Sequence, residues 1–380
     1  MTSPCMLASV HVVHQTMSVK ESKPNLTVSQ ATEITGRLFG LTVSSVCPLP
    51  SYSDQNFHVV SSEGGQYVLK VMNSVDSQNL PLLEVQTHTM NFLRQRGLPA
   101  QTAVPTVTGQ LMSLEEIDCG FGVQKYLVRL LTFLPGTTIV KVTCTLQLLY
   151  EAGRTAATMD TVLVQMEHPH LRALQRENFI WRLASVPLLE QFLSVLDGDP
   201  LQEVVKKVIE QFKTRVVPKL NSFRKCINHG DFNEQNILVE PDGPSSYRIS
   251  GILDFGDMSS GYFVFELAIT IMYMMIKRPR PLAVGAAVLA GWESVIPLNP
   301  EERDVLYLLV LSRFCQSLVL AHYTVLQQPE NEEYLMVTAR PGAQLLQLLW
   351  ETGRDEVEKI WFSGAAEFIQ NSLRTDGVNN

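Results

Sequence analysis

The segment His229-Gly-Asp-Phe-Asn-Glu-Gln-Asn236 decides the fold of this chain, together with the apolar residues Ile237-Leu-Val239 that follow it directly. A second polar motif, Leu253-Asp-Phe-Gly-Asp257, comes after another β-prone run. A turn-forming Pro-Asp-Gly-Pro sequence lies between the two runs, so the spacing from Asp231 to Asp254 fits one β-hairpin. The sequence therefore predicts two polar loops that a short hairpin holds next to each other.

The order H-x-D-x-x-x-x-N followed by D-F-G is the catalytic-loop and metal-loop pattern of kinases. Phosphoryl transfer requires in-line positioning and neutralisation of phosphate charge. In this pattern Asp231 accepts the proton of the attacking hydroxyl, while Asn236 and Asp254 offer hard oxygen ligands to Mg²⁺. We expect His229 to orient the loop rather than to titrate. A single Asp or Asn is usually a turn former or a helix cap, so the prediction depends on the joint pattern.

The N-terminal part of the chain offers matching residues for a nucleotide. Lys70 ends a predicted strand, and Glu84 lies near the start of the next predicted helix. In kinases a strand lysine holds the α- and β-phosphates and a helix glutamate aligns it. Alone, each of these two would be interpreted as a solvated surface residue. The segment 51–56 lies where kinases cover the phosphates but has no glycine; we include Asn56 among the nucleotide-binding candidates, and which residues of this loop make contact is open.

Hydrophobic periodicity divides the chain into parts with different structure. We predict a flexible N-terminal tail at 1–26, a nucleotide-binding lobe at 27–131, a hinge at 132–136, and a C-terminal catalytic and substrate-binding lobe at 137–380. Helices are expected at Thr27–Phe39, Leu82–Arg96, Leu146–Ala157, Val204–Leu220 and Val305–Tyr323, and strands at Val43–Leu49, Phe57–Val60, Gln66–Val71, Tyr126–Phe133, Ile237–Val239 and Tyr247–Leu253. The fold class is α+β, a protein-kinase-like two-lobed fold with a small β-rich N-lobe and a large, mainly helical C-lobe.

The most apolar run, Tyr262–Ile276, contains Glu266 and is too short to span a membrane, so it is predicted to be a buried core helix. A buried carboxylate must find partners, and we expect Glu266 to hold the backbone of the catalytic loop.

Composition excludes several classes of protein. The chain has 380 residues, of which 45% are hydrophobic and 18% charged, which excludes a disordered chain and a disulfide-stapled miniprotein. A net charge of −8 argues against partners such as nucleic acid or an anionic membrane. The six cysteines form no CxxC pair and predict free thiols. The first 19 residues contain no Lys or Arg, which argues against a secretory or mitochondrial presequence and leads us to predict a cytoplasmic protein.

The two loop motifs resemble those of the aminoglycoside phosphotransferase and choline kinase group of small-molecule kinases. Gly230 stands where protein kinases usually have Arg, and no Ala-Pro-Glu follows Asp254, so a protein kinase is disfavoured. Longer stretches resemble a vertebrate branch of this group: Leu49–Val59, Tyr126–Gly136, Arg176–Trp181, Gly251–Ser259 and Tyr334–Ala339. That resemblance implies transfer of the γ-phosphate of GTP to the side-chain hydroxyl of 5-hydroxylysine, in amino-acid catabolism. The residues themselves do not distinguish GTP from ATP.

A hydroxylysine carries two ammonium groups and a carboxylate, so an acidic cleft would attract it. The acids expected to meet the ammonium groups are Asp231, Glu234, Asp257 and Glu177. Asp257 is equally compatible with capping the next helix. Trp181 is expected to line the pocket, with a half-buried structural anchor as its alternative.

The purine is expected to lie against the hinge, with backbone hydrogen bonds around Thr132 to Leu134. Two other functions stay open at this point. One is a kinase of another amino alcohol, such as choline, ethanolamine or homoserine. The other is a pseudokinase that serves as a binding module, against which the intact Lys70, Asp231, Asn236 and Asp254 count.

Overall fold

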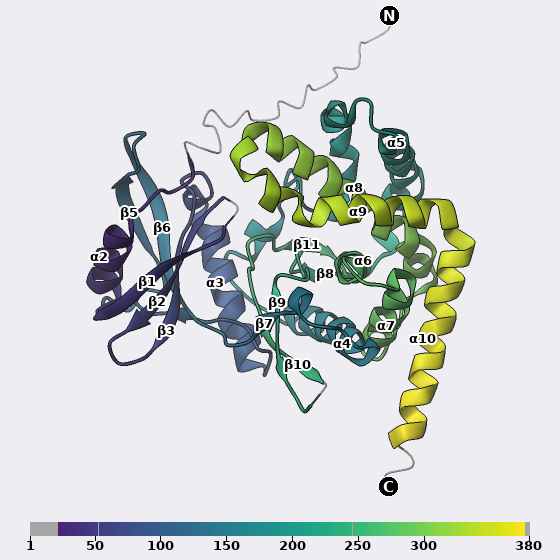
Figure 1. Ribbon diagram of the computed structural model, residues 1–380, viewed down its shortest axis with the longest axis horizontal. Helices are drawn as coiled ribbons and strands as arrows, with labels where there is room; N and C mark the ends of the chain where they lie inside the picture. The colour runs from purple at the N-terminus through teal and green to yellow at the C-terminus, as the bar shows by residue number, and fades with distance from the viewer. Residues whose placement is uncertain (1–21, 52, 245, 377–380) are drawn as a thin grey trace, which may run out of the picture.

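A computed structural model describes residues 22–51, 53–244 and 246–376 of the chain. Figure 1 shows an N-terminal β-sheet with two helices on one side of the molecule and a larger, mainly helical part on the other. The predicted α+β class, with a small β-rich lobe and a large helical lobe, is confirmed.

The N-lobe is built on one antiparallel sheet in the order β1-β2-β3-β6-β4, with β5 also paired to β6. Its strands are β1 (Val43–Leu49), β2 (Gln55–Ser61), β3 (Gln66–Val71), β4 (Ala103–Val104), β5 (Ser113–Asp118) and β6 (Val123–Thr132). Side chains alternate between the two faces of a strand, and the apolar set that includes Phe57, Leu69 and Val128 packs in one cluster with helix α2 (Val28–Phe39). Lys70 therefore points to the opposite face, where helix α3 (Leu80–Gln95) lies.

Helix α2 begins and ends where the sequence predicts. Thr27 and Gln30 form a capping box, and Gly40 ends the helix in the left-handed conformation at φ 68°. Residues 1–21 of the predicted tail, 1–26, lie outside the described residues. Its last residues pack against the sheet: Leu26 is buried, and its backbone exchanges two hydrogen bonds with the Gln55 side chain, at 2.7 and 2.9 Å.

Two small β-structures of the C-lobe carry the loop motifs. Strand β9 (Ile237–Pro241) pairs with β10 (Tyr247–Ile252) and with β7 (Thr137–Thr138), which confirms the predicted hairpin. Strand β8 (Lys225–Asn228) pairs with β11 (Ser259–Tyr262). The four strands β8 to β11 thus enclose both polar motifs, because β8 leads into the first motif and β11 follows the second.

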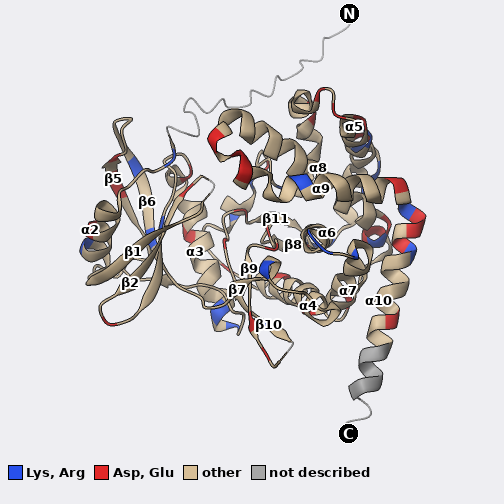
Figure 2. Cartoon of the chain, in the orientation of Figure 1, with Lys and Arg blue, Asp and Glu red and all other residues tan. Residues whose placement is uncertain are grey.

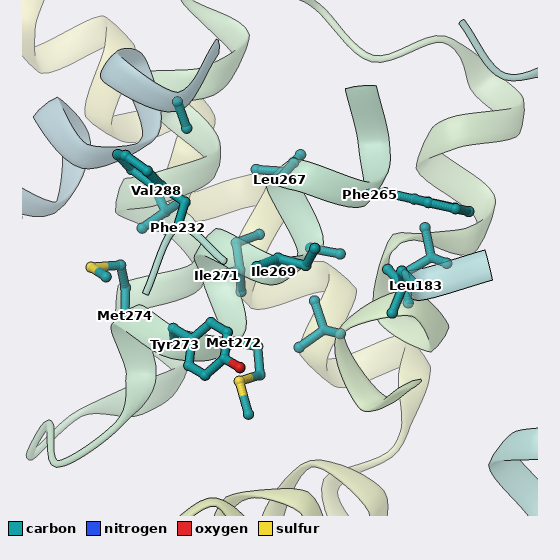
Figure 3. Close-up of a cluster of buried hydrophobic side chains, with 14 of the residues drawn as sticks. Leu183, Phe232, Phe265, Leu267, Ile269, Ile271, Met272, Tyr273, Met274 and Val288 are labelled. Carbon is teal, nitrogen blue, oxygen red and sulfur yellow. The ribbon is translucent and has the colours of Figure 1, made fainter. Parts of the chain in front are cut away.

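Helices surround these strands. They are α4 (Leu146–Leu163), α5 (Leu201–Gln211), α6 (Phe263–Met275), α7 (Pro281–Glu293), α8 (Pro300–Gln327), α9 (Glu332–Thr352) and α10 (Arg354–Asp376). The apolar helix expected at 262–276 is α6, and its residues 264–275 are all buried. Figure 3 shows its side chains packed with Phe232 of the first motif and Val288 of α7. Phe232 thereby anchors the catalytic loop in the core of the lobe.

One helix of the described residues, α8, is long and apolar enough to cross a membrane, and 94% of its most apolar window is buried inside the protein. The packing is that of a central core helix, since α8 contacts α6, α9 and α5.

The helix expected over 204–220 does not continue to its predicted end. Helix α5 stops at Gln211 and is followed by a π-helical turn, Phe212–Val216, and a 3₁₀ segment, Val217–Ser222. Pro218 explains the change, because its ring lacks the N–H and clashes with the carbonyl one turn earlier. The prediction of free thiols holds for the five cysteines that the structure describes.

Candidate active site

Asp231 lies at the centre of a hydrogen-bond network in the first loop. Its Oδ2 atom accepts hydrogen bonds from Asn233 Nδ2 at 2.8 Å and from Asn236 Nδ2 at 2.9 Å. Arg313 of α8 lies on the other side, with Nη2 at 3.4 Å from Asp231 Oδ1. Burial and the nearby carboxylate of Asp257 raise the pKa of Asp231, and the charge of Arg313 opposes that rise. Sequence analysis did not identify Asn233 or Arg313 as partners of Asp231.

His229 joins the two loops. Its Nε2 atom lies 2.9 Å from the carbonyl oxygen of Leu253, and its Nδ1 faces the amide of Asp231 at 3.3 Å. Burial lowers the pKa of His229 to about 4, so the ring is neutral near pH 7. The two contacts fit the tautomer in which Nε2 donates and Nδ1 accepts.

Gly230 takes a conformation that other residues avoid, at φ 81°. A Cβ atom at this position would lie 2.6 Å from the carbonyl oxygen of Asp257. The close approach of the two loops therefore requires a glycine here, which explains why no arginine follows the histidine.

The backbone of the same loop is fixed by two buried groups. Glu266 of α6 accepts a hydrogen bond from the Gly230 amide at 3.0 Å, which confirms the structural position expected for it. Arg313 donates to the Gly230 carbonyl at 3.1 Å and to the Trp181 carbonyl at 2.8 Å. Burial raises the pKa of Glu266 to about 7.

Lys70 connects the sheet of the N-lobe to the second loop. Its Nζ atom is 3.4 Å from Asp254 Oδ1 and 3.1 Å from Asp54 Oδ2. The positive charge of Lys70 is the main cause that lowers the pKa of Asp254, whose side chain is 49% exposed. Asp254 has a positive φ of 55°, which is rare outside glycine and marks a conformation that the fold imposes.

The expected Lys70–Glu84 pair is not formed in the described part of the chain. Glu84 points outward on α3, and its Oε2 atom lies 3.5 Å from His170 Nε2. Asp54, at the end of the loop between β1 and β2, occupies the position beside Lys70 instead. Sequence spacing suggested Glu84 because a helix residue is easier to locate than one in an irregular loop.

Asn236 and Asp254 are suited to a magnesium ion that binds together with phosphate groups. No group of three or more His, Cys, Asp or Glu side chains could hold a metal ion within the described residues. Asn236 and Asp254 are adjacent, since the Leu253 amide donates to the Asn236 carbonyl at 2.9 Å. The Asn236 amide nitrogen is used on Asp231, which leaves its side-chain oxygen available. One amide oxygen and one half-exposed carboxylate suit Mg²⁺, which takes few protein ligands and completes its shell with phosphate and water.

The backbone groups of the predicted hinge segment, residues 132–136, are the candidates for binding a purine. Thr132 donates its amide to Thr102 at 2.9 Å, and its carbonyl accepts from Gln101 at 3.1 Å. Phe133 donates to Gln66 at 3.2 Å. Within the described residues, the backbone of Leu134 makes none of these hydrogen bonds, so Leu134 rather than Thr132 has groups available for a purine.

Comparison with known proteins identifies the family. The model of the phosphotransferase enzyme family, which includes aminoglycoside phosphotransferases, matches residues 45–303. This chain belongs to that phosphotransferase enzyme family. It is 68% identical to the hydroxylysine kinase of Danio rerio, over 93% of this chain and 100% of that one. It is 51% identical to the hydroxylysine kinase of Bos taurus, over 91% and 95% of the two chains.

The fold comparison agrees with this family. A solved amicoumacin kinase superposes with a TM-score of 0.64 at 14% identity, covering 85% of this chain and 94% of that one. As a member of the phosphotransferase enzyme family, the chain is an enzyme that transfers phosphate to an alcohol group.

The acids that sequence analysis assigned to the substrate lie in different environments within this phosphotransferase. Asp257 is half-buried, and burial raises its pKa to about 6, with Arg176 acting in the opposite direction. Glu177 is exposed. Glu234 is 2% exposed and accepts a hydrogen bond from Thr338 of α9 at 3.0 Å. Glu234 thus ties the N-terminal half of α9 to the catalytic loop, and its contact with a substrate ammonium group stays a prediction.

Trp181 is half-buried, with the Arg313 guanidinium 5.2 Å from its ring centre. Its position fits the structural alternative that the sequence left open, because its carbonyl and its ring both contact Arg313. The arginines near this region are engaged with backbone carbonyls: Arg176 with Gly256 at 2.8 Å and Arg182 with Ser260 at 3.2 Å.

The start of α9 was not expected at the site. Thr338 of α9 donates to Glu234 of the first loop at 3.0 Å, and burial and then the charges of Asp254 and Asp231 raise the pKa of Tyr334 on the same helix. Acidic residues gather beside it, at the beginning of α9 (Figure 2): Glu330, Glu332 and Glu333. Glu332 is paired with Arg340 at 2.7 Å, and the remaining excess of negative charge would favour cationic ligands.

Proposed function

We propose that this phosphotransferase transfers the γ-phosphate of GTP to the side-chain hydroxyl of 5-hydroxylysine. The observation that carries the proposal is the geometry of Asp231, whose carboxylate is oriented by Asn233, Asn236 and Arg313. Such a carboxylate, in a loop that His229 links to the second loop with its Asp254–Lys70 pair, is what transfer to a hydroxyl requires.

Asp231 acts as the base that accepts the hydroxyl proton. The two amide side chains hold the Oδ2 atom, and Arg313 favours the ionised form that a base needs. Neutral His229 takes no proton from the substrate in this scheme; it fixes the spacing between the two loops. Asn236 and Asp254 would hold Mg²⁺, which would supply positive charge to neutralise the phosphate groups.

Lys70 binds the α- and β-phosphates of the nucleotide. Its ammonium group is buried beside Asp254, so it is already positioned for phosphate oxygens near the metal ligands. The hinge contributes the backbone of Leu134 to the purine. Asn56 lies directly opposite Lys70 on β2, and its buried Oδ1 atom has no partner among the described residues. The choice of GTP rests on sequence resemblance alone.

The assignment of 5-hydroxylysine draws on the curated relatives, which are named hydroxylysine kinases. Asp257, Glu177 and the acidic start of α9 supply negative charge for its two ammonium groups. A cytoplasmic location and the absence of nucleic-acid or membrane partners stay predictions, which fractionation of expressing cells would check.

The test is a phosphoryl-transfer assay on the purified protein with Mg²⁺. GTP and ATP are each combined with hydroxylysine, lysine, choline, ethanolamine and homoserine, and product masses are measured. We expect phosphate to be added to hydroxylysine, with GTP preferred and lysine inert. A product on homoserine or choline instead would reassign the acceptor, and bound nucleotide without any product would favour a binding module.

A further inference from the structure

A row of polar side chains crosses the N-lobe sheet. Asn56, Lys70 and Arg129 occupy directly opposite positions on β2, β3 and β6. Residues that face each other across antiparallel strands lie on the same side of the sheet. Their neighbours Leu69 and Val128 pack towards α2, so the polar row faces α3.

The row contains two buried cations, and two carboxylates, Asp54 and Asp254, lie beside it. Lys70 is 8% exposed and Arg129 is 1% exposed. Arg129 donates to Thr87 of α3 at 3.1 Å, and no carboxylate of the described residues lies within ion-pair distance of it. Asp54 and Asp254 both lie within ion-pair distance of Lys70. Their negative charges also interact with the charge of Arg129 at longer range. The positive and negative charges of this group balance, which a buried site requires.

Asp54 is held rigidly. It is 9% exposed, and its Oδ1 atom accepts hydrogen bonds from the backbone amide of Asn73 at 3.0 Å and from Asn73 Nδ2 at 3.2 Å. Its Oδ2 atom remains for Lys70, at 3.1 Å. By contrast, the Glu84 side chain is 47% exposed and turned towards His170. Of Asp54 and Glu84, only Asp54 is both fixed in place and in contact with the lysine.

We propose that Asp54, and not Glu84, is the positioning residue that holds Lys70 in place for the nucleotide phosphates. Asp54 lies between β1 and β2, at the position in the sequence where kinases cover the phosphates, so the same ion pair links this segment to the lysine. Arg129 supplies the second positive charge, which offsets Asp54 when Lys70 and Asp254 turn to the ligand. This inference rests on the proposed function, because it concerns how that site holds a nucleotide.

The experiment compares Asp54→Asn with Glu84→Gln as a matched control, since both changes remove one carboxylate charge without changing side-chain size. Binding of GTP and of ATP is measured by calorimetry, with Mg²⁺ and again in EDTA, so that effects through the metal are separated. We expect Asp54→Asn to weaken nucleotide binding about tenfold in both conditions, and Glu84→Gln to leave it unchanged. Melting temperatures without nucleotide report any loss of folding.

A double-mutant cycle tests whether Asp54 acts through Lys70. If it does, Lys70→Met should weaken binding more than Asp54→Asn, and the combined variant should bind no more weakly than Lys70→Met alone. Additive losses would mean that Asp54 acts independently of Lys70 and would overturn the proposal. If Asp54→Asn does not fold, Asp54→Glu serves instead, with an expected intermediate affinity because the charge is kept but displaced.

Two outcomes would overturn the inference directly: unchanged affinity in Asp54→Asn, or an equal loss in Glu84→Gln. Because no acceptor is present, a wrong acceptor leaves this test unaffected. Wild-type protein that binds neither GTP nor ATP would overturn the proposed function itself, and this inference with it. A split in turnover kinetics gives a further check, since a positioning defect should raise the nucleotide KM more than it lowers kcat.

Discussion

Among single residues, the two loops have different roles, so some substitutions should affect nucleotide binding and others turnover. Asp231 is tied to Asn233, Asn236 and Arg313, whereas Asp254 is tied to Lys70. The first group orients a base, and the second holds charge around a nucleotide. These two functions should separate on mutation.

Asp231→Asn should retain Mg-nucleotide affinity within about threefold and lose at least about a hundredfold in kcat, because only the base is removed. Asp254→Ala should weaken Mg-nucleotide binding as well, since it removes a proposed metal ligand and a partner of Lys70. Calorimetry and steady-state kinetics on both variants check this. Equal and mild effects of the two changes would refute the assigned roles.

Arg313 allows a second test, because it makes contacts that a lysine cannot reproduce. One guanidinium reaches the carbonyls of Trp181 and Gly230 and the carboxylate of Asp231. Arg313→Lys should therefore lower kcat about tenfold or more while the nucleotide KM changes little. Arg313→Met should in addition destabilise the fold by roughly 3 kcal/mol, because it leaves Asp231 and the carbonyls of Gly230 and Trp181 without their donor. Denaturant unfolding separates these effects; a lysine variant with full activity would contradict the positioning role.

At the scale of elements, the site depends on two loops that approach each other at Gly230. The hairpin β9–β10 connects the two loops along the chain, and the contact of His229 with the Leu253 carbonyl holds the loops at a fixed spacing. The contact leaves no room for a side chain, since a Cβ atom at Gly230 would meet the Asp257 carbonyl at 2.6 Å. The glycine is thus a requirement of the packing between two elements.

A matched pair of glycine variants measures that requirement. Gly230 and Gly97 have nearly the same backbone angle, at φ 81° and 84°, but a Cβ atom at Gly97 has nothing within 4 Å. Both Gly→Ala changes should cost about 1 kcal/mol from the backbone. Gly230→Ala should cost at least about 1 kcal/mol more, and should also lower kcat because the two loops move apart. Unfolding free energies that are equal in the two variants would show that the loops adjust without strain.

At the scale of the whole molecule, buried carboxylates make stability depend on pH. Glu266 is fully buried in α6, and its pKa rises from 4.5 to about 7 on folding. The native state then binds more protons than the unfolded state between these two values. Stability should therefore fall as pH rises from about 4.5 to 7, by roughly 3 kcal/mol for this group.

Glu266→Gln should flatten this part of the stability profile, because the amide keeps an oxygen for the Gly230 N–H but cannot ionise. The exposed Glu84→Gln serves as the control and should leave the profile unchanged. Urea unfolding at several pH values between 4.5 and 7.5 measures the slope. A slope that is equally steep in Glu266→Gln would assign the pH dependence to other groups, such as Asp257, whose pKa is raised to about 6.

The sequence alone was enough to predict the fold class, the hairpin between the two motifs and the core helix α6. It also selected Asp231, Asn236, Asp254 and Lys70 as candidates, which the fold brings close together. These follow from local patterns, since periodicity and motif spacing act over short stretches of chain. The three-dimensional packing was needed to show which acid lies beside Lys70, that Glu234 is buried, and that Arg313 and Thr338 reach the first loop from α8 and α9. The physical reason is that such partners are separated by long stretches of sequence, and their contact depends on how whole elements pack and not on any local preference.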